Sequence, residues 1–213
     1  MFSHKLSENA SFKTYVHWFI LSFLAGNINT GGFLACGRFV SHVTGFATLA
    51  GISLKNGSVL ETVGILSIPG YFLAGAMTSG YLTEKRRARS FNGEKYAPVL
   101  SLVALCMALA TLGGVANFFG QFGEPANLAH DYFLLALLCG ACGLQNAAIT
   151  SASGSTVRTT HLTGLTTDLG LGIIRAEIHH AKPEERKQER KANLLRLGTI
   201  GSFVLGSFVG ALF

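Results

Sequence analysis

Most of the charged residues of this chain are clustered in two short stretches, and this clustering limits the possible folds more than any other feature. Of the 28 Asp, Glu, Lys and Arg residues, 18 lie within residues 84–95 and 175–196. Apolar residues make up 49% of the chain, and the charged share of 13% is about half that of an average soluble protein. The long uncharged stretches suit a lipid bilayer. We therefore expect an all-α, polytopic helical membrane protein.

Seven apolar segments can be distinguished along the chain. Five of them approach or exceed the roughly 20 residues that cross a hydrocarbon core of about 30 Å, and they cover residues 15–36, 58–82, 96–119, 132–151 and 194–213. Two further helices are expected at 42–54, with Ser41 as N-cap, and at 158–178. The helix at 42–54 would be only about 20 Å long, which is short for a span. The polar run Ala25–Gly32 favours a break inside the first segment.

An internal repeat relates the two halves of the chain. The pattern His-(Val/Leu)-Thr-Gly-x-x-Thr-x-x-Gly occurs at 42–51 and again at 161–170, and the same separation of 119 residues pairs Asn27 with Asn146. We therefore expect one membrane domain, 1–213, built from two structural repeats of three segments each. Repeat one covers about 15–82, a connector helix covers 96–119, and repeat two covers about 132–213.

The basic loops distinguish two membrane topologies. Residues 84–95 hold five Lys or Arg and residues 175–191 hold six, whereas residues 120–131 hold none. The positive-inside rule places both basic loops and the N-terminus in the cytoplasm. This requires the two repeat cores to be half-helices that enter and leave on one side, which gives five full spans and an inverted repeat. The alternative is seven full spans in a parallel arrangement, with the two basic loops on opposite faces.

Polar side chains at membrane depth are the candidates for a substrate or ion path, because they are costly unless they face a cavity or one another. On a helix His161, Gly164 and Asp168 share one face, and helix N-termini carry a positive dipole end that suits a polar or anionic solute. The candidates are His42, Thr44, Thr48, Asn27, Asn29, Gln145, Asn146, Arg158, His161, Thr163, Thr167 and Asp168. In the alternative interpretation the Thr residues only pack, the amides are interhelical clamps, and Arg158 and Asp168 form a structural pair.

Other chemistry finds little support in the sequence. Cys139 and Cys142 form a C-x-x-C pair inside an apolar segment, where a reactive thiolate is disfavoured. His179 and His180 lie in a charged loop and are expected to be solvated. No phosphate-binding loop, zincin motif or catalytic triad order is found. We therefore expect no catalytic residue, metal or cofactor, and we assign the net charge of +6 to anionic lipid headgroups and not to nucleic acid.

Three stretches carry a resemblance to a known family. They are VSHVTGFATLAG (40–51), GLQNA (143–147) and VRTTHLTGLTTDLG (157–170). With them the chain resembles the YoaK-like family of bacterial multi-pass membrane proteins, whose function is unknown, over nearly its whole length. The resemblance implies a bacterial inner membrane and no established activity. Phe46 stands where the family often has Asn, and Asn29 stands where an Asp is common, so any coupling through that acid is in doubt.

Three functions remain open on this sequence. The first is a small transporter or channel for a polar or anionic solute, with its site between the two H-x-T-G helix starts. The second is a non-catalytic membrane subunit or scaffold, and the third, less favoured, is a membrane-embedded enzyme. The expected partners are the lipid bilayer and the solute, with a homo-oligomer left open.

Overall fold

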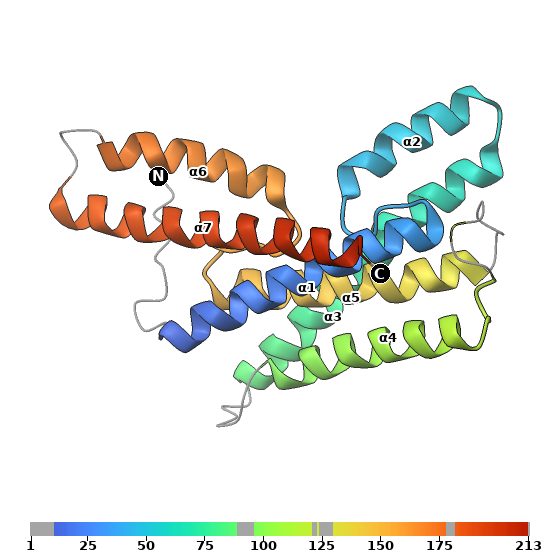
Figure 1. Cartoon of the computed structure of the whole chain (residues 1–213), viewed down its shortest axis with the longest axis horizontal. Coiled ribbons are helices and arrows are strands. Elements are labelled where there is room, and N and C mark those ends of the chain that lie inside the picture. The colour runs from blue at the N-terminus through green and yellow to red at the C-terminus, as the bar shows by residue number, and fades with distance from the viewer. Residues whose placement is uncertain (1–10, 89–95, 121–122, 124–129, 178–181, 213) are drawn as a thin grey trace. The chain divides into compact units, whose positions relative to one another are not determined.

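The computed structural model describes residues 11–88, 96–120, 123, 130–177 and 182–212, and these residues fold into helices without any strand. This confirms the all-α class expected from the sequence. The seven helices of the described residues are α1 (Phe12–Cys36), α2 (Val43–Lys55), α3 (Val59–Ala88), α4 (Ala97–Val115), α5 (His130–Ala152), α6 (Leu162–Glu177) and α7 (Pro183–Gly210) (Figure 1).

Helix length divides these elements into two classes. Helices α1, α3, α4, α5 and α7 each contain a stretch long and apolar enough to cross a membrane. Helices α2 and α6 have 13 and 16 residues, about 20 and 24 Å at 1.5 Å per residue. The chain is therefore a multi-pass membrane protein with five candidate spans among the described residues, and two shorter helices accompany them.

The chain divides into two compact units. The α1–α7 unit contains Met1–Asn27 and Ile149–Leu212, and the α3–α5 unit contains Ile28–Ala148. Helices α1 and α5 each contribute residues to both units. Each unit thus takes helices from both of the predicted repeats, and the predicted division into repeats stays a prediction.

In the α1–α7 unit, helices α1 and α7 run parallel, with contacts from Trp18 to Asn27 of α1 and from Leu195 to Gly210 of α7. Trp18 shares a buried cluster with Leu195 near the start of α1. Further along, the Ser22 hydroxyl donates to the Thr199 carbonyl at 2.8 Å. The last contact is backbone against backbone, because a Cβ on Gly210 would come within 2.9 Å of the Asn27 carbonyl oxygen.

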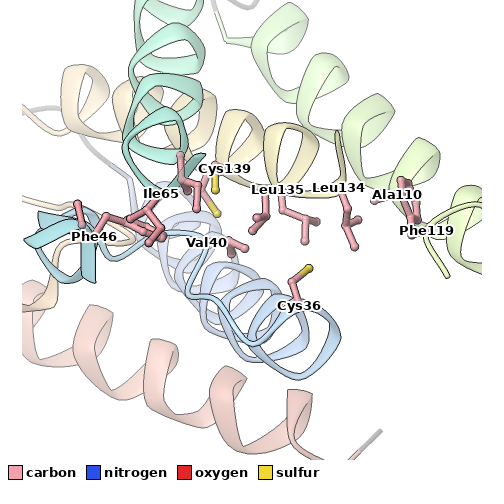
Figure 2. Close-up of a cluster of buried hydrophobic side chains, with 13 residues drawn as sticks. Cys36, Val40, Phe46, Ile65, Ala110, Phe119, Leu134, Leu135 and Cys139 are labelled. Atoms are coloured by element: carbon pink, nitrogen blue, oxygen red, sulfur yellow. The ribbon is translucent and has the colours of Figure 1, made fainter. Parts of the chain in front are cut away.

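The core of the α3–α5 unit is built around α5. Leu134, Leu135 and Cys139 of α5 are buried in one cluster with Ile65 of α3 and Val40 of the segment before α2 (Figure 2). A second cluster joins α4 to the later turns of α5, with Val99 and Val103 packed on Ala141, Leu144 and Ala148. Because the start of α4 lies against the end of α5, these two helices are antiparallel.

Each short helix folds back on the long helix that follows it. Arg38, just before α2, lies 3.5 Å from Glu61 in the first turn of α3, so the chain enters and leaves α2 at the same end of its unit. In the other unit the Arg186 Nε of α7 donates to the Ala176 carbonyl in the last turn of α6 at 3.1 Å. Figure 1 shows α2 beside the start of α3 and α6 beside α7.

Three local expectations from the sequence are wrong. Helix α1 continues through the polar run to Cys36 without a break. It ends there because Gly37 adopts a left-handed φ of 63°, which glycine permits at little cost. The N-cap of α2 is His42 and makes no side-chain cap bond, whereas Ser41 points back to α1. Helix α6 begins at Leu162, so Arg158 and His161 lie before it and not on it.

Two helix crossings, one in each unit, use glycine for backbone contact. In the α1–α7 unit a Cβ on Gly26 would overlap the Phe203 carbonyl oxygen, and a Cβ on Gly206 would overlap that of Phe23. Such close approach is typical of small-residue packing in membranes. The Gly26 face of α1 and the Gly206 face of α7 therefore pack against each other within the same chain.

The α3–α5 crossing repeats these contacts with different residues. A Cβ on Gly143 would overlap the Phe72 carbonyl oxygen, and a Cβ on Gly75 would overlap that of Gly140. Gly143 lies 117 residues after Gly26, and Gly140 lies 117 after Phe23. Applied to the amides of α1 and α5, this register pairs Asn146 with Asn29, and not with Asn27 as the separation of 119 had suggested.

Candidate functional site

The start of α6 brings a cation and an imidazole together. The Nη1 of Arg158 lies 3.3 Å from the Nδ1 of His161. A guanidinium can only donate, so in this contact Nδ1 is the acceptor and the ring hydrogen is on Nε2. Arg158 is half-buried and His161 is exposed. The first backbone N–H groups of a helix have no acceptor inside that helix, so the start of α6 also presents backbone donors.

A glycine makes room for this arrangement. A Cβ added to Gly164 would lie 2.7 Å from the Nδ1 of His161 and 3.2 Å from the Nη1 of Arg158. Because both neighbours are side chains, a larger residue at this position would displace the imidazole and the guanidinium and leave the backbone in place. The geometry of the α6 start therefore depends on glycine at 164.

At the start of α2 a histidine and a glycine occupy the same positions as at the start of α6, but the residue that contacts the histidine is different. His42 contacts the residue three positions before it, as His161 does, but that residue is Phe39. The two rings are 5.7 Å apart and meet edge to face at 74°. Gly45 matches Gly164, yet a Cβ there would be 3.6 Å from the His42 Nδ1, an ordinary contact. The α2 start is therefore aromatic and uncharged, whereas the α6 start is cationic.

Polar side chains hold the linkers before both short helices. Asn29 on α1 accepts a hydrogen bond at its Oδ1 from the Ser41 hydroxyl at 2.9 Å and another from the Ser41 N–H at 3.3 Å. Before α6, the Ser153 hydroxyl accepts from the Val157 N–H at 3.0 Å. Asn29 thus ties the linker before α2 to α1, and the interhelical clamp considered for the amide residues is a different contact.

The remaining amide candidates lie on the two helices that enter both units. Gln145 is buried and Asn146 is half-buried, both on α5 within the α3–α5 unit. Asn27 is half-buried on α1, where its backbone and side chain lie against Gly210 of α7. Asn27 therefore takes part in the α1–α7 crossing.

The threonine and aspartate candidates lie on the two short helices, α2 and α6. Thr44 and Thr48 are exposed on α2, and Thr163 and Thr167 are exposed on α6. The Thr167 hydroxyl donates to the Thr163 carbonyl one turn back, at 3.0 Å. Asp168 is half-buried on α6. No ion pair among the described residues joins Asp168 to Arg158, so the structural pair weighed for these two residues is not formed.

Sequence reasoning missed a polar cluster in the α3–α5 unit. The Glu61 carboxylate accepts a hydrogen bond from the Ser53 hydroxyl at 2.9 Å and lies 3.5 Å from the Arg38 guanidinium. These contacts tie the end of α2 and the segment before it to α3. Arg38 and Glu61 stand alone in apolar sequence, so the rule that singled out Arg158 and Asp168 would have found them too.

A second missed cluster lies on α7, where α6 packs against it at Gly172. Arg196, whose side chain is only 6% exposed, donates from Nη1 to Glu189 at 2.8 Å and to Asn193 at 2.7 Å. This cluster occupies the space over Gly172 of α6, where a Cβ would meet all three side chains. The sequence did not single out Arg196 because it is the last charged residue of the segment 175–196. A single buried cation cannot be distinguished from its exposed neighbours in such a segment.

Metal and thiol chemistry lack a suitable arrangement in the described part of the chain. No group of three or more His, Cys, Asp or Glu residues able to hold a metal occurs among these residues. Cys139 and Cys142 are free and buried on α5. His179 and His180 lie outside the described residues.

Comparisons with known proteins leave the activity open. A search of curated proteins and a search of solved structures find no match. A family model described as a protein of unknown function, DUF1275, matches residues 17–213, nearly the whole chain. The protein therefore belongs to the DUF1275 family of proteins of unknown function.

Proposed function

We propose that this protein is a small transporter or channel for an anionic or polar solute, and that the start of α6 contacts the solute. The observation that carries the proposal is the pairing of Arg158 with His161 over Gly164 at a helix N-terminus. This start offers a guanidinium, an imidazole Nε2–H and free backbone N–H groups, all of which are donors. Donors at the positive end of a helix favour an anion.

The membrane setting supports transport more than surface binding. A cation near membrane depth is costly, and such residues usually mark substrate or ion pathways. The chain departs from helical backbone before both short helices, with positive φ at Gly37, Gly154 and Ser155. Non-helical backbone at such depth is tolerated where it is buried in protein or lines a cavity, as at transporter sites.

The proposed topology has five crossings. Helices α2 and α6 each fold back on the following long helix, and we propose that neither crosses the membrane. Two crossings, α4 and α5, then separate the basic segments 84–95 and 175–191, so that both lie on one side. The positive-inside rule makes this side the cytoplasm of a bacterial inner membrane. The two three-helix halves would be inverted relative to each other.

Labelling of single cysteines tests this topology. The native cysteines are replaced, and Asn56, Ser90 or Gln188 is changed to Cys and treated with an impermeant thiol reagent. Ser90 lies outside the described residues, whereas Asn56 and Gln188 are exposed. Five crossings predict labelling of Ser90 and Gln188 from the cytoplasm and of Asn56 from the opposite side. Seven crossings predict that Asn56 and Gln188 share a side and Ser90 does not.

Flux measurements test the function. Proteoliposomes of phosphatidylethanolamine and phosphatidylglycerol are shrunk osmotically, and their reswelling is followed in potassium chloride, phosphate, sulfate or acetate and in glycerol, with valinomycin present for the potassium salts. We expect protein-dependent reswelling for at least one anion or for glycerol, reduced about tenfold by Arg158→Gln, one lost cationic donor. His161→Ala and Asp168→Asn are the further tests of the site. If all three variants match the wild type, the site assignment is wrong.

A membrane subunit or scaffold would need a free face to recruit a partner. The small-residue faces that could recruit a partner, at Gly75 and Gly206, are occupied by Gly140 and Phe23 of the same chain. An enzymatic role lacks a nucleophile or metal set among the described candidates, and we propose that the protein is not an enzyme.

A further inference from the structure

The first turns of α7 carry a basic face that the proposed transport site does not use. A hollow of about 330 Å³ is lined by Pro183, Arg186, Lys187 and Arg190. These positions follow the i, i+3, i+4, i+7 spacing of one helix face. All the charged residues of this α7 basic face are cations. The acidic residues of the same turns, Glu184, Glu185 and Glu189, take other positions.

The last turn of α6 orders two of these cations. Arg186 donates from Nε to the Ala176 carbonyl at 3.1 Å, and the Nη2 of Arg190 lies 3.3 Å from the Glu177 carboxylate. The Arg190 and Glu177 side chains are 63% and 66% exposed, so their pair is weak and leaves most of the guanidinium accessible. The side chain of Lys187 is exposed. The face is therefore partly preorganised and still open to an anion.

Aromatic and apolar neighbours place this face at the depth of lipid headgroups. One residue beyond it, the Lys191 Nζ lies 5.4 Å from the centre of the Tyr15 ring, and Tyr15 contacts Trp18. Tyr15 is only partly buried, and tyrosine is enriched at membrane interfaces. From Leu194 onward the exposed side of α7 is apolar, with Leu194 and Leu197 both exposed. The cations thus come directly before the lipid-facing part of the same helix.

We propose that the α7 basic face binds the phosphate of an anionic phospholipid headgroup, with Arg186, Lys187 and Arg190 as donors. Guanidinium groups match the oxygens of a phosphate, and several donors on one face can share it. The exposed leucines that follow along α7 would take the acyl chains of the same lipid. This site is separate from the α6 start, and the proposal does not rest on transport.

Thermal unfolding of the full-length protein in a neutral detergent tests this proposal. Dioctanoyl phosphatidylglycerol is titrated, with dioctanoyl phosphatidylcholine and inorganic phosphate as the other arms. We expect phosphatidylglycerol to raise the melting temperature, and the other two to have little effect. The variant Lys187→Gln/Arg190→Gln should bind phosphatidylglycerol about 25-fold more weakly, since each cation near an anionic surface contributes roughly a fivefold change. Arg186 is kept because it bonds to α6.

The matched control removes the same charge elsewhere. Lys13→Gln/Lys55→Gln takes away two exposed cations that do not line the hollow, and should retain the affinity of the wild type. The exchange Lys187→Arg/Arg190→Lys should also retain it, which guards against a variant that merely folds poorly. Equal weakening in both neutralised variants would show non-specific charge attraction and overturn the proposal. An equal shift with inorganic phosphate, lost in the Lys187→Gln/Arg190→Gln variant, would replace the lipid by a soluble anion.

Discussion

The starts of α2 and α6 share a motif but differ in the residue that contacts the histidine. Phe39 meets the His42 ring edge to face, whereas Arg158 donates to His161. The space above the glycine three residues after each histidine also differs. A Cβ would fit at Gly45, whereas at Gly164 it would be too close to the histidine ring. A repeated H-x-T-G pattern therefore does not give two equivalent sites. In our proposal only the α6 start, of these two, contacts the transported solute directly.

The same difference extends to the clusters that hold the short helices. Helix α6 packs at Gly172 on a cluster of α7 built around the nearly buried Arg196, whereas α2 is bonded to α3 through Ser53 and Glu61, with the Arg38 guanidinium at 3.5 Å. Removing one partner of a buried pair costs far more than removing one partner of an exposed pair. Substitutions in the cluster beside α6 should therefore reduce stability more than substitutions in the cluster beside α2. We expect the same order for their effect on function.

The largest expected effect comes from the buried arginine. Arg196→Met leaves Glu189 and Asn193 without their donor and should lower the free energy of unfolding by about 3 kcal/mol. Arg38→Met should cost at most about 1 kcal/mol, because this pair is long and partly exposed. Chemical or thermal unfolding in detergent, followed by circular dichroism, measures both. Equal losses would mean that the two clusters contribute equally to stability.

The crossings should respond alike in the two units. Gly26→Ala and Gly143→Ala each force a Cβ against a backbone carbonyl, and each should cost about 1–3 kcal/mol. Matched controls are Gly201→Ala on α7 and Gly80→Ala on α3, where a Cβ meets nothing. These should be neutral or stabilising by up to about 1 kcal/mol, because alanine is the better helix former. A large loss in one unit only would contradict the equivalence of the crossings.

The sequence predicted the positions and lengths of the helices better than the contacts between them. Length and apolar runs located all seven helices, because these properties are local. The pairing of Gly26 with Phe203 and of Gly143 with Phe72 needs the three-dimensional fold, since each joins residues far apart in the chain. The linker before α6 is longer than the one before α2, which explains why a single separation of 119 could not align both α1 with α5 and α2 with α6.

The candidate site was predicted in its residue types and only partly in its geometry. The histidines and Arg158 were singled out because they are polar residues beside apolar segments. Their contacts were missed because Arg158 was placed on a continuous helix with Asp168, whereas the backbone turns at Gly154 and Ser155 and α6 begins only at Leu162. Positive φ at a serine has no strong sequence signal.

A smaller effect should separate the two glycines beneath the histidines. Gly164→Ala displaces His161 and Arg158 and should reduce anion flux several-fold while the melting temperature changes little, since only side chains must move. Gly45→Ala should leave flux unchanged and add up to about 1 kcal/mol of stability. Reswelling rates and melting curves of the same preparations compare the two. Loss of flux in Gly45→Ala alone would assign the solute to the α2 start instead.

The smallest effect is expected at Thr167. Its hydroxyl donates to the Thr163 carbonyl, so it offers no hydrogen to a solute, and Thr167→Val should change flux by less than about twofold and stability by less than about 1 kcal/mol. Thr163→Val, one turn nearer the helix start, removes an exposed hydroxyl two residues after His161 and should reduce flux more. Initial reswelling rates at several anion concentrations distinguish weaker binding from slower passage. If Thr167→Val were the more damaging change, the solute would contact α6 along its side, and the donor groups at the helix start would not be the determining ones.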